Sequence, residues 1–177
     1  MSKLVVRWIL ATLVFFPSVA AAQERGDVGV FMGYPSLGLI WQVSDKVALR
    51  PEISFDFSSS EVDSVFTGTG EAESWNIGVG ATALFYLSDA DKLRTYIAPQ
   101  FIYSRSEFGR TGTDGPEANA YGLAGLFGAE YSPTPRFGVF GELGVGYSHQ
   151  STKSGTSSDQ TSDSFGTRAG VGVILYF

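Results

Sequence analysis

Apolar and polar side chains alternate along most of the chain after about residue 27. Near the end, for example, Phe165 and Val171 share one parity, whereas Gly166 and Arg168 share the other. A period of two is typical of β-strands whose two faces meet different surroundings. Eight segments carry the pattern, separated by polar or glycine-rich breaks: 27–34, 36–44, 47–57, 74–87, 94–107, 118–132, 136–149 and 164–177.

The breaks between these segments alternate in length. Those at 44–46, 88–92 and 132–135 are short, and the first of the opposite set, around Pro35, is unusually tight. Longer breaks rich in Ser, Thr, Gly and Asp lie at 58–73, 108–117 and 150–163. This alternation predicts an up-and-down antiparallel arrangement, with short periplasmic turns at one end and long connections that face the outside at the other.

The alternating segments favour a membrane barrel. After the N-terminal segment no stretch approaches 18 consecutive apolar residues, so a crossing of the bilayer would need strands. In hydrocarbon every backbone group must be paired, and only a closed barrel lacks sheet edges. We therefore predict an all-β fold, an eight-stranded antiparallel up-and-down transmembrane β-barrel. A soluble β-sandwich is the alternative, but it would bury the apolar face of its strands.

Aromatic residues near the ends of the segments predict girdles at the two membrane surfaces, where amphipathic rings are favoured. The residues concerned are Tyr34, Trp75, Tyr86, Tyr96, Tyr103, Tyr131, Tyr147 and Tyr176. Pro51 and Pro99 fit poorly, because each lies inside a predicted strand and lacks a ladder donor. We expect a bulge or a local gap at each.

The N-terminal residues have the order of a secretory signal peptide. Lys3 and Arg7 precede an apolar run from Trp8 to Phe16, and small residues follow up to Ala22. The apolar run is about half of the roughly 20 residues that a spanning helix needs. We expect cleavage after Ala22, which places a signal peptide at 1–22 and one barrel domain at 23–177; a retained anchor is the alternative.

Composition narrows the possible partners. Removal of 1–22 would leave 10 basic and 18 acidic residues, a formal charge of 10 − 18 = −8, so we expect no binding to nucleic acid. The sequence has no cysteine, which excludes disulfides and thiolate metal sites. We expect no cofactor, no metal and no catalytic residues.

Signal peptide, eight alternating segments, connections of alternating length and the closing pair Tyr176 and Phe177 together resemble the small outer-membrane barrels typified by OmpA and OmpX. The resemblance covers all of 23–177. It implies location in the outer membrane, contact with its lipids and lipopolysaccharide, and a terminal assembly signal at Tyr176 and Phe177 that the barrel-assembly machinery would read. The chain ends at Phe177 without the peptidoglycan-binding domain of full-length OmpA, so cell-wall anchoring is not implied.

Charged residues with inward parity predict an ion network in the lumen, which eight strands leave little wider than its side chains. They are Arg50, Glu52, Asp56, Glu130, Glu142 and Arg168. Charges held away from water need partners, so we expect the two arginines to pair with some of the four carboxylates. A lumen that conducts protons or ions is the alternative.

Three other features are candidate sites. His149 and Ser151 resemble the His-x-Ser pair of outer-membrane lipid A deacylases, but Thr152 and Lys153 depart from that pattern, and no acidic residue lies in the middle of the final strand to orient the imidazole. The glycines of the sixth and seventh segments do not form a phosphate-binding fingerprint. The loop carboxylates Asp114, Asp159 and Asp163 are expected to be solvated rather than to bind divalent cations.

The sequence thus predicts a non-enzymatic barrel that contributes to envelope integrity or presents outer loops to surfaces, ligands or host molecules. A narrow porin-like channel is the first alternative. A lipid A-modifying enzyme that uses His149 and Ser151 is the second.

Overall fold

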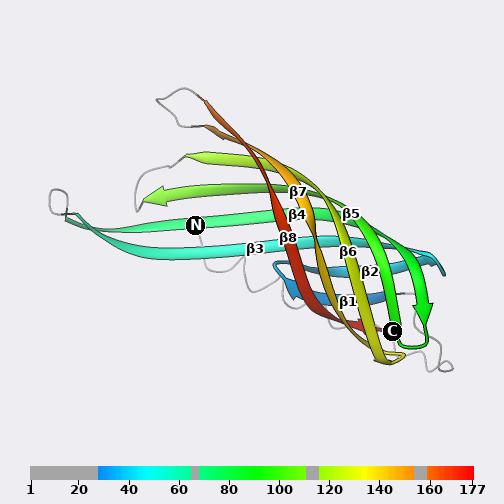
Figure 1. Cartoon of the computed structure of the whole chain (residues 1–177). Helices are drawn as coiled ribbons and strands as arrows, with labels where there is room; N and C mark the ends of the chain where they lie inside the picture. The colour runs from blue at the N-terminus through cyan, green and yellow to red at the C-terminus, as the bar shows by residue number, and fades with distance from the viewer. Residues whose placement is uncertain (1–27, 65–67, 111–115, 154–158) are drawn as a thin grey trace.

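The computed structural model of the chain describes residues 28–64, 68–110, 116–153 and 159–177. It contains eight strands in a closed antiparallel barrel, each paired with its neighbours along the chain and β1 with β8 (Figure 1). The strands are β1 (Val28–Tyr34), β2 (Leu37–Ser44), β3 (Val47–Ser64), β4 (Gly68–Ala90), β5 (Leu93–Arg110), β6 (Glu117–Thr134), β7 (Phe137–Lys153) and β8 (Gln160–Tyr176). The fold class predicted from the sequence is confirmed.

The strands are staggered around the barrel. Met32 on β1 is directly opposite Val173 on β8. If one instead follows the opposed residues from Met32 across β2, β3 and so on to β7, the path reaches β8 at Asp163, ten residues away (173 − 163). A stagger of this kind requires strands that are tilted by about 35–45° from the barrel axis. Each residue therefore adds about 2.4 Å of height, given a rise of roughly 3.3 Å along the strand.

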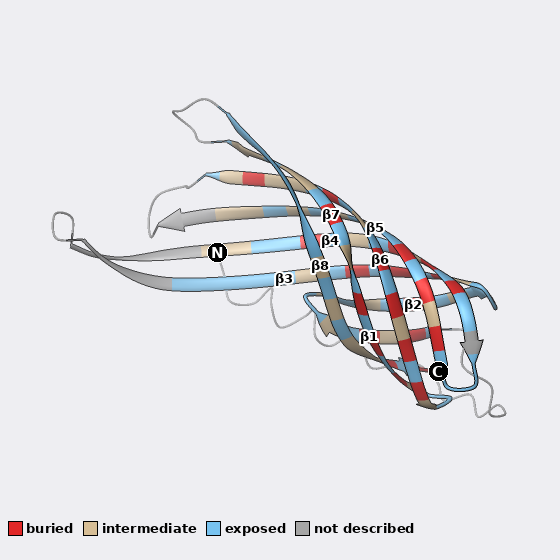
Figure 2. Ribbon diagram, in the orientation of Figure 1, coloured by how far each residue is buried: buried red, intermediate tan, exposed pale blue. Residues whose placement is uncertain are grey.

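Burial alternates along the strands as the parity of the sequence predicted (Figure 2). On β3, Arg50 and Glu52 are buried while Leu49 and Ile53 are exposed. The inward face forms a core that includes Phe31, Ile40, Leu84, Tyr96, Phe140 and Ile174. Large apolar side chains are instead exposed on the outward-facing side of the barrel wall. This arrangement is favourable in lipid and unfavourable in water.

The outward apolar band has the same height on six strands. On each of β3 to β8, two outward apolar or aromatic residues ten positions apart mark the lower and upper limits of the band. The band is therefore about 24 Å high, close to the roughly 25 Å band of outer-membrane barrels. These pairs are Val47 and Phe57, Phe85 and Trp75, Leu93 and Tyr103, Tyr131 and Tyr121, Phe137 and Tyr147, and Leu175 and Phe165. The second members of the pairs define what we call the outer girdle.

Three of the aromatic residues assigned to the girdles from the sequence were assigned wrongly. Tyr86, Tyr96 and Tyr176 are buried inside the barrel. Proximity to a strand end does not decide which face a residue occupies, whereas parity does: Tyr86 shares its parity with the inward Leu84, and Tyr176 shares its parity with Ile174. Tyr103, Tyr131 and Tyr147 are exposed on the outer face.

The connections predicted at one end are confirmed as short turns, and those at the other end are shorter than predicted. Only two residues separate β2 from β3, β4 from β5 and β6 from β7. The predicted long breaks 58–73, 108–117 and 150–163 are largely strand, because the β3–β4 ladder continues to Ser64 and Gly68 and β7 continues to Lys153. Segments 65–67, 111–115 and 154–158, with Asp114, lie outside the described residues, as does the predicted signal peptide at 1–22.

The two prolines open local gaps in the ladders, as expected. Pro51 is opposite Ala81 on β4 but has no partner on β2 in the described register. Pro99 is opposite Gly125 on β6 but likewise has no described partner on β4. Each proline therefore interrupts one of its two ladders and leaves the other in register. No helix in the described part of the chain is long and apolar enough to cross a membrane.

The β1–β2 hairpin stops well short of the far ends of the other strands (Figure 1). It ends below the outer girdle, since Tyr34 is opposite Val171, six residues before Phe165 is reached on β8. Its turn, from Gly33 to Ser36, contains a cis bond before Pro35, and its last pairs join Tyr34 to Val171 and Leu37 to Ile53. Beyond these pairs, residues 54–57 of β3 and 165–170 of β8 have no strand partner on the hairpin side within the described chain. We call this interval the outer notch; it is four residues deep on β3 and six on β8, or about 10 and 14 Å.

Candidate functional site

The lumen contains three layers of polar side chains, each built from several strands. Strands of period two place every second residue inside, and the stagger of the barrel brings inward residues that are distant in sequence to one height. From the short-turn end toward the outer girdle, the layers are the lowest, the middle and the upper layer.

The lowest layer surrounds Glu130 of β6, which is fully buried. The hydroxyl groups of Tyr176 and Ser132 donate hydrogen bonds to Glu130 Oε1 at 2.8 and 2.9 Å. Arg94 is opposite Glu130 in the β5–β6 ladder, and its guanidinium lies over the Tyr86 ring, 3.4 Å from the ring centroid. This layer joins the start of β5 to the end of β8.

The middle layer is an ion pair across the barrel. Arg50 of β3 donates two hydrogen bonds to Glu142 of β7, from Nη1 at 2.6 Å and from Nη2 at 2.9 Å, and both side chains are buried. Tyr96 adds a third hydrogen bond to Glu142 at 2.9 Å. The rings of Phe31 and Phe140 flank the guanidinium, with centroids 5.1 and 5.3 Å from Cζ. Together these groups pack across the lumen at this height.

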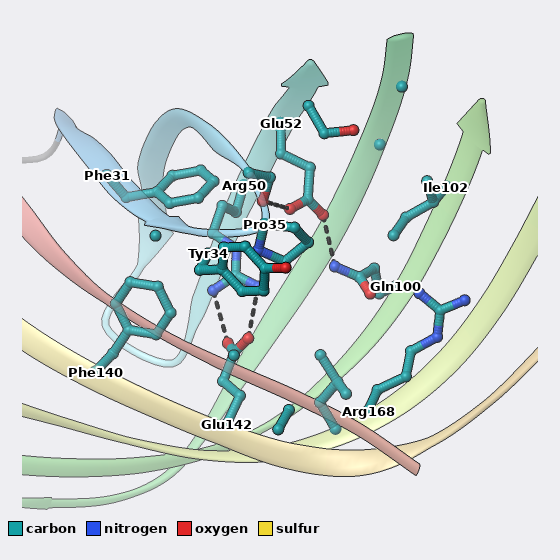
Figure 3. A pocket seen from close by; sticks show the side chains of 18 of the residues that line it. Phe31, Tyr34, Pro35, Arg50, Glu52, Gln100, Ile102, Phe140, Glu142 and Arg168 are labelled. Atoms are coloured by element: carbon teal, nitrogen blue, oxygen red, sulfur yellow. Dashed lines mark hydrogen bonds and ion pairs between the residues drawn. The ribbon is translucent and has the colours of Figure 1, made fainter. Parts of the chain in front are cut away.

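The upper layer surrounds Glu52 of β3. Its carboxylate accepts hydrogen bonds from Ser36 at 2.6 Å, Gln100 at 2.7 Å and Thr82 at 2.9 Å. Arg168 of β8 lies on the opposite side of the same cavity, which has a volume of about 130 Å³ (Figure 3). Within the described residues Arg168 makes no hydrogen bond or ion pair.

Above this layer the lumen widens into a polar vestibule of about 320 Å³. Its wall includes Asp56, Asn76, Ser104, Ser106 and Gln150. Asp56 is exposed here and has no partner among the described side chains, so it is not joined to the ion pair below. Among the described residues no group of acidic, His or Cys side chains is arranged to hold a metal ion.

Comparison with solved structures decides the kind of barrel. A crystal structure of a major outer membrane protein from Thermus thermophilus matches with a TM-score of 0.54 at 14% identity, over 87% of this chain and 100% of that one. The chain has the fold of an outer-membrane β-barrel. Weaker likenesses are to CarO of Acinetobacter baumannii (TM-score 0.46, 16% identity, 89% of this chain and 100% of that one) and to Ail, the attachment invasion locus protein of Yersinia pestis (0.41, 12%, 85% and 93%). No protein-family model matches the sequence, and no curated protein matches it.

The outer-membrane barrel brings together only part of the charge network predicted from parity. Arg50 and Glu142 pair, whereas Glu52 and Glu130 accept hydrogen bonds from the neutral donors described above. The predicted pairing of Arg168 with a carboxylate is not found among the described residues. Parity also places Arg94, Tyr96 and Gln100 on the inward face, although Tyr96 was assigned to a girdle from the sequence and Arg94 and Gln100 were not included in the predicted network.

His149 has an acidic partner that the sequence did not predict, near the start of the final strand rather than in its middle. Asp163 belongs to β8, opposite His149, and its Oδ1 lies 2.7 Å from His149 Nδ1 and accepts a 2.6 Å hydrogen bond from Tyr147. These two hydrogen bonds hold the pKa of Asp163 below its ordinary value, so the interaction is present at neutral pH and is lost as the pH falls through that lowered pKa. Ser151 makes no hydrogen bond to His149 within the described strands, so a nucleophile–base contact is missing.

Proposed function

We propose that this chain is a non-enzymatic outer-membrane protein that anchors a β-sheet and presents it at the cell surface. One observation carries the proposal: six strands continue beyond the outer girdle. β3 extends from Phe57 to Ser64 and β5 from Tyr103 to Arg110, seven residues each, or about 17 Å of height. Figure 1 shows these strands projecting well past the β1–β2 hairpin.

The projecting sheet has features that suit contact with a partner. Its two outermost strands, β3 and β8, have unpaired edges beyond the hairpin within the described chain. An unpaired edge can bind an extended segment of another molecule by adding a strand to the sheet. The middle layer of the lumen supports this role over that of a channel, because the Arg50–Glu142 pair and two phenylalanines lie across the path.

Export and assembly belong to the same proposal. The charged and apolar pattern of residues 1–22 supports removal of a signal peptide after Ala22, which would deliver the barrel to the periplasm and then to the outer membrane. Phe177 lies exposed at the edge of the outer face, and its amide donates a 3.0 Å hydrogen bond to Val28. This position supports its proposed role, with Tyr176, as the signal for barrel assembly, and the apolar band supports contact with membrane lipids and lipopolysaccharide.

Shortening the projecting sheet should abolish surface binding without unfolding the barrel. Residues 60–72 would be replaced by Asn-Gly, a two-residue hairpin turn, between the opposed residues Ser59 and Glu73. In a Gram-negative host that displays the protein, we expect adhesion to matrix-coated surfaces to fall to the level of cells without it. Heat-modifiable gel migration should be kept, because the band within the membrane is unchanged.

The matched control replaces only residues 65–67 by Asn-Gly and keeps the ladder up to Ser64 and Gly68. This variant should adhere like the unmodified protein. If both variants adhere normally, or if the unmodified protein confers no adhesion to any surface tested, the proposal of surface presentation is wrong.

A further inference from the structure

The outer notch is a polar interruption in the apolar wall of the barrel. Its edges, residues 54–57 of β3 and 165–170 of β8, extend from the end of the hairpin up to Phe57 and Phe165 of the outer girdle, so they are at the depth of the outer leaflet. Unpaired backbone groups that face hydrocarbon are costly. They are tolerated where water or a polar group covers them, and the vestibule above supplies a path for both.

The upper-layer cavity opens beside this notch and is lined by the hairpin turn. Pro35 and Ser36 form one side of it, and Arg168 and Gly170 of β8 form another. Its remaining wall mixes apolar side chains such as Phe31 and Ile102 with the polar groups around Glu52 (Figure 3). About 130 Å³ is close to the roughly 150 Å³ of a cavity that holds benzene, so it has room for a small headgroup and a few methylenes.

Arg168 supplies the charge of this site. Its side chain lies flat across β7 and β6, where glycines leave it room: a Cβ at Gly146 would be 2.5 Å from Nε, and one at Gly122 would be 3.1 Å from Nη2. In the part of the chain that the structure describes, this guanidinium has no carboxylate partner, although Arg50 does. An arginine held against the wall of a partly apolar cavity is a binding group for a carboxylate.

We propose that the outer notch admits a single-chain carboxylate amphiphile of the fatty-acid type from the outer leaflet, with its carboxylate on Arg168 and its chain passing through the notch into the bilayer. The backbone edges of the notch provide the lateral path, and the small mixed cavity fits a carboxylate and the first methylenes. The Glu52 carboxylate on the opposite wall repels any anion, and it repels a dianion such as a phosphate monoester more strongly than a monocarboxylate. This binding is independent of the projecting sheet.

The test uses the barrel in phosphatidylcholine nanodiscs and follows Arg168 Nε–H and the Gly170 amide by NMR during titration with laurate. Both signals should shift saturably with laurate, whereas dodecanol should bind at least about 10-fold more weakly because it lacks the charge-assisted hydrogen bonds. Acetate at the same concentrations should produce no saturable shift. Arg105 Nε–H, in an exposed pair with Glu117, is the internal control and should not move.

Variants of the arginine separate recognition of charge from folding. R168Q should weaken laurate binding at least about 10-fold as read from Gly170, and R168K, which keeps the charge, should weaken it less. Heat-modifiable migration of each variant shows that the barrel is intact. Equal binding of acetate and laurate would make this a site for water-soluble anions, and equal binding of dodecanol, or no saturable shift, would show that no carboxylate is recognised; each result overturns the proposal.

Discussion

Replacing Glu142 with Gln should lower the free energy of unfolding by about 3–5 kcal/mol. The change leaves the guanidinium of Arg50 buried without its ionic partner, and the loss of one partner of a buried pair typically has this cost. Tyr96 also loses its charged acceptor. Urea unfolding of the barrel in lipid vesicles, followed by gel migration, would measure the difference.

The matched control for this prediction is Glu117→Gln. Glu117 forms a similarly short 2.7 Å pair with Arg105, but both side chains are nearly half exposed, so its loss should change stability by less than about 1 kcal/mol. The double variant R50M/E142L, which keeps side-chain volume and removes both charges, should recover most of the lost stability. Equal effects of E142Q and E117Q would show that the middle layer does not hold the barrel together.

Replacing Gly144 with Ala should prevent the closed barrel from forming or destabilise it by about 3 kcal/mol or more. A Cβ at Gly144 would overlap the carbonyl oxygen of Gly125 and come within 2.8 Å of Leu126 Cα, so backbone of β6 would have to move. Overpacking that displaces backbone is at or above the usual 1–3 kcal/mol range. Heat-modifiable migration and urea unfolding would report the loss.

Gly166→Ala is the corresponding control. Gly166 also faces inward, on β8, but a Cβ there would meet nothing within 4 Å. We expect this variant to differ from the unmodified barrel by no more than about 0.5 kcal/mol. If G144A folds with the same stability as G166A, the close approach of β6 and β7 is not a requirement of the fold.

The parity of the sequence was sufficient to predict the fold and the faces of the strands, because one face meets lipid and the other meets the lumen. It could not predict which inward charges meet. Arg50 and Glu142 are 92 positions apart, and their contact depends on the ten-residue stagger that the ladders set around the barrel. Arg168 also faces inward and was expected to pair with a carboxylate. Its side chain instead lies against the glycines of β6 and β7.

The projecting strands were missed for a different physical reason. Beyond the outer girdle both faces of a strand meet water, so the alternation that marks a strand disappears while backbone pairing continues. The segment Ser58–Ser64 therefore has the sequence pattern of a polar connection, although every one of its residues is paired with β4. The position of Asp163 opposite His149 was hidden in the same way, since its segment had been read as a loop.

Gel migration of the detergent-folded protein before and after boiling shows whether the chain closes into a barrel with an apolar outer wall. A closed, paired barrel resists unfolding by the gel detergent, so the unboiled band should migrate differently from the boiled one, and circular dichroism should show mainly strand. Equal migration of the two samples, or complete folding in the absence of detergent, would contradict such a barrel and indicate a soluble β-protein.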